Sequence, residues 1–374
     1  MAKKATTSAE VPRDVGGDNL RAWLVKTPED AIDPLQPIID PHLHLFDRRP
    51  RRTLPDGART HLRYLGDDLM QDIRGGGHNV IDTVFVECLS MYREDRADPL
   101  RSVGEVQFAQ GIAAMAASGL YGEGVRCCGG IVGFADLTLG AGVEPILRAL
   151  KAAGENFRGI RHAHAWHESS TIANSHHPTS DISGLLGRDN FREGFAVLDK
   201  LGLTFDCWGY HTQLAEVADL AAAFPGVTII LNHIGGPVAR GPYEGQRTAQ
   251  VFDTWESSVR LVAGCPNVVV KVGGFGMPIY GFDYSVGDAG PPSSQRLAED
   301  WKPYFDILID AYGPERCMFE SNFPVDKVSY SYTSLWNAFK LIATDLGMTS
   351  AQKNDLFFGT AARAYSLPLP GERG

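Results

Sequence analysis

The 374-residue sequence has no excess of basic residues and no long apolar run. Its 35 lysine and arginine residues are outnumbered by 45 aspartate and glutamate residues, for a formal net charge of −10. A nucleic-acid-binding domain would carry a basic face, so the charge argues against nucleic acid as a partner. No stretch reaches the roughly 18 apolar residues that a membrane helix needs. Residues 1–18 lack the apolar centre of a secretory signal, so we expect a cytoplasmic protein.

Cysteine is scarce, and its spacing excludes two kinds of small cross-linked site. The six cysteines form no CxxC pair, and most of them lie within or beside apolar runs. This pattern is typical of buried free thiols rather than of a zinc ribbon or a disulfide framework. Glycine and proline, in contrast, recur between the apolar runs, as many short connections require.

What the sequence does contain is a regular alternation of short β-branched runs and helical stretches. We predict strands at residues 37–45, 81–87, 129–137, 157–165, 203–209, 227–233, 268–274 and 317–323. Eight strand–helix units predict an α/β fold, a parallel sheet closed into a (β/α)8 (TIM) barrel. The alternative is an open doubly wound sheet. That fold usually has a glycine-rich phosphate loop after its first strand, where this chain has histidines.

A single domain accounts for nearly the whole chain. We predict a partly flexible lead-in at residues 1–36, the barrel at 37–367 and a tail at 368–374. Residues 46–79, 169–190 and 278–294 are expected to form long loops over the carboxyl ends of the strands, where the chemistry of such barrels takes place. Helices are predicted at 104–119, 143–153, 190–201, 213–224, 249–263, 297–312, 335–346 and 351–364.

Three histidines lie at the ends of predicted strands. His42 and His44 are two residues apart on the first strand, so their side chains point the same way and can reach one divalent ion. His233 ends the sixth strand, just before a glycine turn. Each histidine alone could be structural. Their expected convergence at one barrel mouth is what favours a catalytic role.

Four motifs follow one another along the chain. They are Asp-Pro-His-Leu-His at 40–44, Phe-Arg-Gly-Ile-Arg-His at 157–162, Asn-His-Ile-Gly-Gly-Pro at 232–237 and Phe-Glu-Ser-Asn-Phe-Pro at 319–324. In this order they resemble the amidohydrolase superfamily, and above all its lactonase-rich branch, which includes sugar lactonases and 2-pyrone-4,6-dicarboxylate lactonase. The resemblance extends over residues 37–367 and implies a hydrolase barrel that often cleaves C–O rather than amide bonds.

One position departs from the family pattern. The family usually has an aspartate at the end of the eighth strand, as metal ligand and general base, and this chain has Asn322 there. An amide cannot take up a proton near neutral pH and is a weak metal ligand. The fourth strand also offers no bridging lysine, so we do not expect a binuclear site. The resemblance leaves two alternatives: one divalent ion, zinc first, held by His42, His44 and His233, or catalysis without metal.

The general base must then be another group. Glu87, at the end of the second strand, and Asp206, on the fifth, are the main candidates, with Glu320 and Asp326 near the eighth strand. For Glu87, a salt bridge to an arginine is an equally good interpretation.

The expected substrate is a small anion. Arg161 ends the fourth strand, where a guanidinium could bind a carboxylate through two hydrogen bonds. His211, Trp166 and Tyr210 lie near strand ends and are further candidates for substrate binding, although barrel packing explains the aromatic residues almost as well.

We therefore predict a hydrolase that opens a carboxylate-bearing lactone or a similar cyclic ester by attack of water. A non-oxidative decarboxylase of the same superfamily is the first alternative. A catalytically silent barrel that only binds a ligand is the second, and Asn322 favours it. Neither nucleic acid nor a membrane is expected as a partner, and assembly into homo-oligomers is left open.

Overall fold

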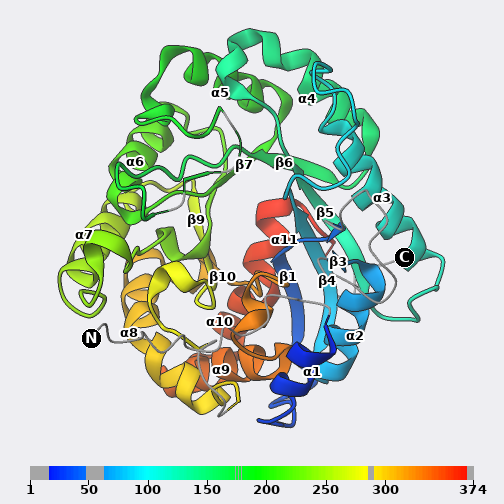
Figure 1. Cartoon of the computed structure of the whole chain (residues 1–374), viewed down its shortest axis with the longest axis vertical. Coiled ribbons are helices and arrows are strands. Elements are labelled where there is room, and N and C mark those ends of the chain that lie inside the picture. The colour runs from blue at the N-terminus through cyan, green and yellow to red at the C-terminus, as the bar shows by residue number, and fades with distance from the viewer. Residues whose placement is uncertain are drawn as a thin grey trace, which may run out of the picture.

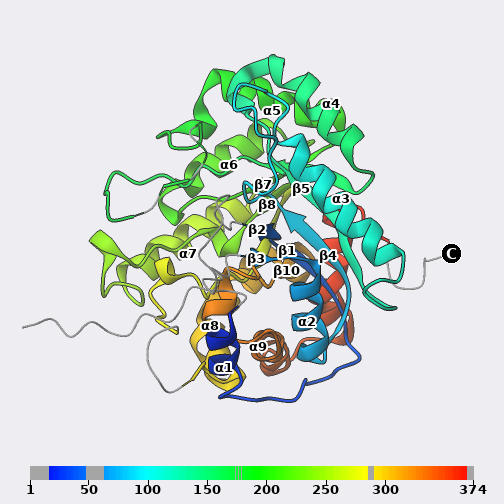
Figure 2. The same ribbon diagram turned by 45° about the vertical axis from the view of Figure 1, so that its right-hand side comes forward.

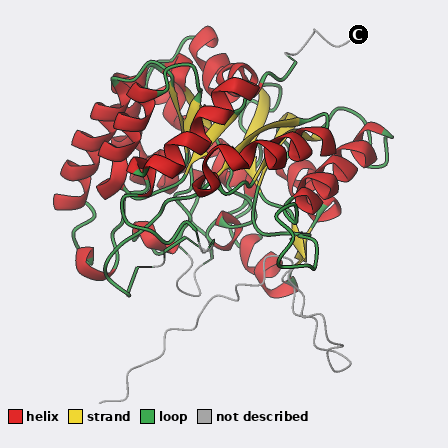
Figure 3. Cartoon of the chain, turned by 90° about the horizontal axis from the view of Figure 1, so that it is seen from above, coloured by secondary structure: helices red, strands yellow, loops and turns green. Residues whose placement is uncertain are grey.

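The computed structural model describes residues 17–47, 63–172, 174–175, 177, 179–284 and 290–368. Its main sheet is parallel and follows chain order, with the strands in the centre and helices around them (Figures 1 and 3). The predicted (β/α)8 barrel is confirmed. The strands are β1 (Pro37–Leu43), β4 (Asn79–Val86), β5 (Arg126–Gly133), β6 (Phe157–Arg161), β7 (Thr204–Cys207), β8 (Ile229–Leu231), β9 (Val268–Val272) and β10 (Cys317–Phe319).

The barrel closes just beyond the ends of its first and last strands. Leu43 and Phe323 form a parallel bridge. The amide of His44 donates to the carbonyl of Phe323 (2.8 Å), and the amide of Asn322 donates to the carbonyl of His42 (2.9 Å). Most strands end earlier than predicted, so His44 and Asn322 belong to the loops. This closure places the first and eighth strand ends side by side.

Seven of the eight predicted helices are present as single helices, and each of them buries apolar residues. In α4, for example, Ile146, Leu147 and Leu150 are buried at helical spacing. The eighth, predicted at residues 351–364, is interrupted by a π-helical turn at 355–359. The helices that follow strands are α3 (Val103–Ala117), α4 (Glu144–Ala153), α5 (Asp189–Leu201), α6 (Leu214–Ala223), α7 (Gln250–Ala263), α8 (Ser294–Tyr312) and α9 (Tyr332–Asp345). No helix among the described residues is long and apolar enough to cross a membrane.

The prediction of a loop throughout residues 46–79 is wrong. Helix α2 (Gly66–Gly76) lies there, and β2 (Phe46–Asp47) pairs with β3 (Arg63–Tyr64). The helix starts where Asp68 accepts a hydrogen bond from the amide of Leu65 (3.0 Å), and it buries Leu69, Met70 and Ile73. Consecutive glycines at its end hid this short apolar stripe. Residues 48–62 of the predicted loop lie outside the described residues.

The C-terminal helices close the amino end of the barrel. After α10 (Ser350–Asn354), helix α11 (Thr360–Tyr365) lies beside β1 (Figure 1). It packs Ala361, Ala362 and Tyr365 among strand residues that include Ile39 and Val84. Tyr365 is fully buried and reaches upward into the barrel interior. A residue near the end of the chain thereby contributes to the core beneath the candidate site.

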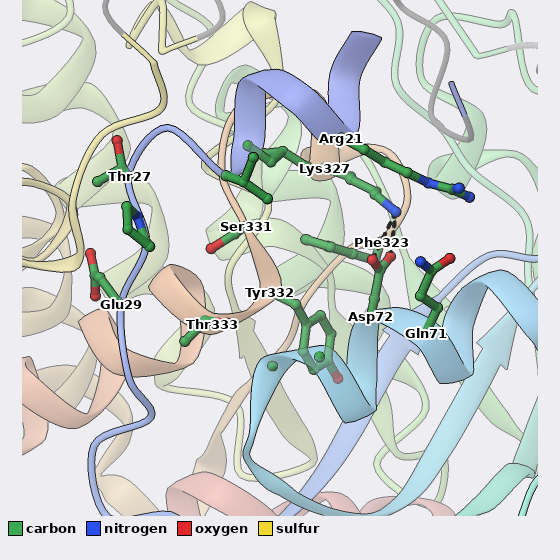
Figure 4. A pocket seen from close by; sticks show the side chains of 15 residues that line it. Arg21, Thr27, Glu29, Gln71, Asp72, Phe323, Lys327, Ser331, Tyr332 and Thr333 are labelled. Atoms are coloured by element: carbon green, nitrogen blue, oxygen red, sulfur yellow. Dashed lines mark hydrogen bonds and ion pairs between the residues drawn. The ribbon is translucent and has the colours of Figure 1, made fainter. Parts of the chain in front are cut away.

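Residues 17–36 lie against the outside of the barrel, with α1 (Asp18–Leu24) beside α2 and the start of α9 (Figures 1 and 2). Glu29 accepts hydrogen bonds from the amide of Ser294 (2.6 Å) and from Asn337 Nδ2 (3.0 Å). Between α1, α2 and α9 is a cavity of ≈ 360 Å³, where the ammonium group of Lys327 is paired with Asp72 (2.7 Å; Figure 4). Residues 1–16 of the predicted lead-in and 369–374 of the tail lie outside the described residues.

Candidate active site

His42, His44 and His233 converge at the carboxyl ends of β1 and β8. The Nε2 atoms of His42 and His44 are 3.2 Å apart, and the rings of His42 and His233 have centroids 4.4 Å apart. All three side chains are buried, with His44 the most exposed at 5%. The structure brings together the three histidines that the sequence singled out, while their chemical roles remain predictions.

A hydrogen-bond acceptor fixes the tautomer of two of these histidines. His44 Nδ1 lies 2.8 Å from the carbonyl oxygen of Val86, which can only accept, so the Nδ1 atom carries the proton. His233 Nδ1 lies 2.7 Å from Glu320 Oε1, which also accepts from the His233 amide (3.1 Å). The neutral His44 ring therefore keeps a free lone pair on Nε2, and the neutral His233 ring does so when Glu320 is ionised.

His42 lies between a donor and an acceptor. Its Nδ1 atom is 3.1 Å from the ammonium nitrogen of Lys271 and 3.0 Å from Glu320 Oε2. If Nδ1 accepts from Lys271, the proton of His42 is on Nε2 and faces the lone pair of His44. The contact with Glu320 Oε2 lacks hydrogen-bond geometry, so the structure favours the arrangement in which Nδ1 accepts from Lys271. If Nδ1 instead carries the proton, the two facing Nε2 atoms both carry lone pairs. The site therefore has two proton arrangements that differ at one imidazole.

Lys271 is the main site residue that the sequence analysis missed. It is fully buried on β9, and its Nζ atom is 2.6 Å from Asp206 Oδ1. Asp206 also accepts hydrogen bonds from Asn232 Nδ2 (2.9 Å) and from the hydroxyl of Tyr365 (2.9 Å). The available signal was one lysine within the valine run at 268–272, which we read only as a strand.

Glu87 and Arg161 form a buried ion pair beside His42. Arg161 Nε is 2.7 Å from Glu87 Oε1, and Arg161 Nη2 donates to the Glu87 carbonyl (2.7 Å). His177 Nε2 contacts the other carboxylate oxygen of Glu87 at 2.9 Å. The salt-bridge interpretation of Glu87 is thus the one found in the structure. The remaining nitrogen of Arg161, Nη1, lies 3.4 Å from His42 Nε2.

Burial dominates the electrostatics of the site. Loss of hydration lowers the pKa of His42, His44 and His233 well below its usual range, and the Arg161 charge acts in the same direction. The three imidazoles are therefore neutral near pH 7. Burial also raises the pKa of Glu320 to about 8, so near pH 7 this side chain is mostly protonated, and it accepts from both His42 and His233 only in its ionised form.

The side chain of Asn322 is turned away from the three histidines. Its Nδ2 atom donates to Asp326 Oδ1 (2.8 Å), and Asp326 also accepts from the Tyr330 hydroxyl (2.6 Å) and the Gly276 amide (3.0 Å). Asn322 adopts a left-handed backbone conformation, with φ of 54°. The Asn322 amide, which replaces the family's aspartate, is thus hydrogen-bonded to the carboxylate of Asp326.

Two glycines after β9 leave space for Glu320 and His233. A Cβ atom on Gly273 would lie 2.4 Å from Glu320 Cγ, and one on Gly274 would lie 2.7 Å from His233 Cβ. Gly274 also has φ of +75°, which other residues rarely adopt. Glycine at 273 and 274 is therefore what lets the Glu320–His233 contact form.

The other predicted substrate-binding residues form a neighbouring group. Gln213 Oε1 accepts from the amides of Trp166 (3.1 Å) and Tyr210 (3.3 Å), while His211 Nδ1 accepts from the Val238 amide (3.2 Å). The ring in contact with the histidines is instead that of Trp208, at 4.8 Å from His233. A substrate-binding role for Trp166, Tyr210 and His211 remains a prediction.

Two donor sets could hold one divalent ion. Among the described residues, His42, His233 and Glu320 each place one ligand atom within 4.8 Å of the other two, and His44 is not part of that group. His42 and His44 form a second pair of donors. Their Nε2 atoms are 3.2 Å apart, close to the roughly 3.3 Å between two nitrogen ligands of a tetrahedral zinc. The ammonium group of Lys271, 3.1 Å from His42 Nδ1, opposes a cation at the Nδ1 side of His42.

Comparison with known proteins agrees with this architecture. A family model of amidohydrolases matches residues 39–367. The chain is 31% identical over 341 residues to the uncharacterized protein y4mH of Sinorhizobium fredii, an alignment that covers 88% of this chain and 98% of that one. It is 27% identical over 242 residues to L-fucono-1,5-lactonase of Burkholderia multivorans, which covers 65% of this chain and 73% of the lactonase. The crystal structure of a B. multivorans amidohydrolase with bound zinc superposes with a TM-score of 0.63, at 24% identity over 88% of this chain and 99% of that one. The match over nearly the whole barrel shows that this chain belongs to the amidohydrolase family.

Proposed function

We propose that the protein hydrolyses a carboxylate-bearing lactone or a similar cyclic ester. The observation that supports this most is the cluster of three neutral, buried imidazoles at the barrel mouth, next to the guanidinium of Arg161. The similarity to L-fucono-1,5-lactonase supports the same reaction class. Hydrolysis needs a polarised carbonyl, an activated water and a group that receives the proton of that water.

His233 is our candidate for the general base. The two main carboxylate candidates from the sequence are occupied, because both oxygens of Glu87 and both oxygens of Asp206 accept contacts from other side chains. His233 has a free lone pair on Nε2, and Glu320 orients its ring from the opposite nitrogen. A base oriented by a carboxylate is the arrangement found in nucleophile–base–acid triads.

His42 and His44 are our candidates for activating the carbonyl. When His42 is protonated on Nε2, that N–H group can donate to the developing oxyanion. In the other proton arrangement, His42, His44 and His233 would hold one divalent ion, with zinc the first candidate. When bound, such an ion supplies Lewis-acid polarisation of the carbonyl and lowers the pKa of a coordinated water.

Replacing Glu320 by glutamine is expected to weaken zinc binding about 10–100-fold. Glutamine cannot accept from the Nδ1 atoms of both His42 and His233, which Glu320 now contacts at 3.0 and 2.7 Å. Competition with a chelating dye measures the affinity. Asp326→Asn is the matched control, since it also removes a buried carboxylate but one bonded to Asn322 and Tyr330. Equal zinc affinity in the wild type and Glu320→Gln would contradict this role.

Replacing Arg161 by alanine is expected to raise KM for an anionic lactone by about 30–160-fold, which corresponds to the loss of a charge-assisted hydrogen bond of about 2–3 kcal/mol. The change also removes the arginine partner of Glu87 while its contact with His177 remains, and this loss affects every substrate. A neutral lactone of the same ring size is therefore the control, and its KM should change much less. The same factor for both substrates would mean that Arg161 supports the fold of the site rather than the anion.

The reaction itself is tested with the purified protein and a panel of neutral and carboxylate-bearing lactones. Hydrolysis releases one proton per turnover and adds the mass of one water to the product, which a pH indicator and mass spectrometry detect. Release of CO2 without gain of water would instead identify the non-oxidative decarboxylase. Saturable binding without turnover of any compound would support the alternative of a catalytically silent, ligand-binding barrel. The observation that favours this alternative is that Asn322 is hydrogen-bonded to Asp326.

A further inference from the structure

A second cavity lies beside the candidate active site, among the loops that follow β4, β5 and β6. It measures ≈ 380 Å³, a size that accommodates a small organic molecule. We refer to it as the β4–β6 cavity. The residues that matter here are Tyr92, Arg96, Arg101, Phe134, Leu139 and His177, all of which line it.

The walls of the β4–β6 cavity are aromatic and apolar. Phe134 and His177 stack with ring centroids 3.7 Å apart and planes inclined by 4°, and Tyr92 lies 6.5 Å from His177. Leu139 is 49% exposed, and Leu89, which has a left-handed φ of 61°, is 41% exposed. Large apolar side chains that are partly exposed to solvent beside stacked rings favour the binding of a ligand with a flat apolar ring.

Two arginines of this cavity lack a carboxylate partner. Among the described residues, neither Arg96 nor Arg101 forms an ion pair, and the buried Arg101 Nε has no hydrogen-bond partner. The Arg101 guanidinium carbon lies 5.3 Å from the centre of the Tyr92 ring. In the cavity of Figure 4, in contrast, Asp72 neutralises Lys327.

The acidic residues of the wall are already engaged. Asp136 Oδ1 accepts from the amide (3.0 Å) and the hydroxyl (2.6 Å) of Thr138. Asp98 Oδ1 accepts from the Leu100 amide (2.8 Å), and its other oxygen is 3.8 Å from Arg93. These carboxylates leave Arg96 and Arg101 unpaired. They would repel a dianion more than a monoanion, so the cavity suits a single negative charge.

The β4–β6 cavity is separated from the three catalytic candidates by a layer of protein. His177 forms part of its wall, and behind His177 lie Glu87 and then Arg161, whose Nη1 atom reaches His42. A ligand in the cavity therefore does not contact the site where we place hydrolysis.

We propose that the β4–β6 cavity is a second binding site, for an aromatic monocarboxylate. The guanidinium of Arg101 binds the carboxylate, Arg96 adds positive charge at the rim, and the ring lies against Tyr92, Phe134 and His177. Arg101 is suited to this because its planar guanidinium can pair with a carboxylate through two parallel hydrogen bonds. This site is independent of the proposed lactone hydrolysis.

Isothermal titration of the full-length protein with benzoate tests the proposal, with benzamide as the uncharged ligand of the same shape. We expect saturable binding of benzoate and at least about tenfold weaker binding of benzamide. Arg101→Gln should weaken benzoate binding by at least about tenfold, and Phe134→Leu by several-fold. Arg260→Gln, which removes an arginine on α7 that is paired with Glu256 and Asp310 and is not in the cavity wall, should leave the affinity unchanged. Thermal melting of each variant shows that it is folded.

The variant His233→Ala separates this site from the active site. Benzoate should bind it as it binds the wild type, because His233 is not part of the cavity wall. Loss of benzoate binding in His233→Ala would place the ligand in the catalytic centre and overturn the proposal. Absence of benzoate binding at millimolar concentration, or equal affinity in wild type and a folded Arg101→Gln, would overturn it as well. None of these results depends on whether the protein hydrolyses lactones.

Discussion

Replacing Lys271 by methionine is expected to lower the free energy of unfolding by about 3–5 kcal/mol, the typical cost of removing one partner of a buried ion pair. Lys271 and Asp206 are both fully buried, with 2.6 Å between Nζ and Oδ1. Without the ammonium group, Asp206 keeps the Asn232 and Tyr365 hydrogen bonds but no cationic partner. Urea unfolding of wild type and variant measures the difference.

Two further variants identify the cause of this loss. Lys302→Met removes a lysine that is 35% exposed and paired with Asp306 on the surface of α8, so it should cost less than about 1 kcal/mol. Adding Asp206→Asn to Lys271→Met removes the uncompensated charge and should recover part of the lost stability. If Lys271→Met costs no more than Lys302→Met, or if Asp206→Asn brings no recovery, Lys271 does not act as the counter-charge of Asp206.

Replacing His233 by alanine is expected to lower kcat/KM for lactone hydrolysis about 100- to 1,000-fold. The variant removes the proposed base together with the hydrogen bond between His233 Nδ1 and Glu320, and a positioned acid–base group typically contributes about 10²–10⁴ in rate. Steady-state kinetics with the best substrate of the lactone panel gives the number. Added imidazole should restore part of the activity, because it can occupy the space of the missing ring and accept the proton.

His78→Ala is the matched control for His233→Ala. His78 is also a buried histidine, but it bonds to Lys340 Nζ (2.8 Å) and to the Thr333 carbonyl (3.3 Å), outside the candidate site. Its replacement should change stability and leave kcat/KM within a few-fold of wild type. An active His233→Ala enzyme would mean that another group takes the proton, and the Nε2 atom of His44 would be the next candidate.

The fold was predictable from the sequence because its signals are local. Eight apolar runs with helical stretches between them predict a parallel barrel whatever the distant contacts are. The spacing of His42 and His44 places both imidazoles on one face of a strand, and the position of His233 at a strand end places it at the same mouth. Local periodicity was therefore enough to identify the three histidines that the structure brings together.

The partners of these histidines were decided only by the tertiary structure. Lys271 is paired with an aspartate 65 residues away, and Tyr365 reaches that same Asp206 from 159 residues away. The pairing of each carboxylate with a particular cation depends on strand register, on side-chain rotamers and on burial. None of these is a local property of the chain. The sequence alone determined the barrel and which three histidines meet at its mouth. The packing of distant strands decided that Glu87 pairs with Arg161, that Asn322 bonds to Asp326, and that a lysine lies beside His42. The physical reason is that a buried charged or polar group is stable only when it is paired, and its partner can come from any part of the chain that the fold brings near.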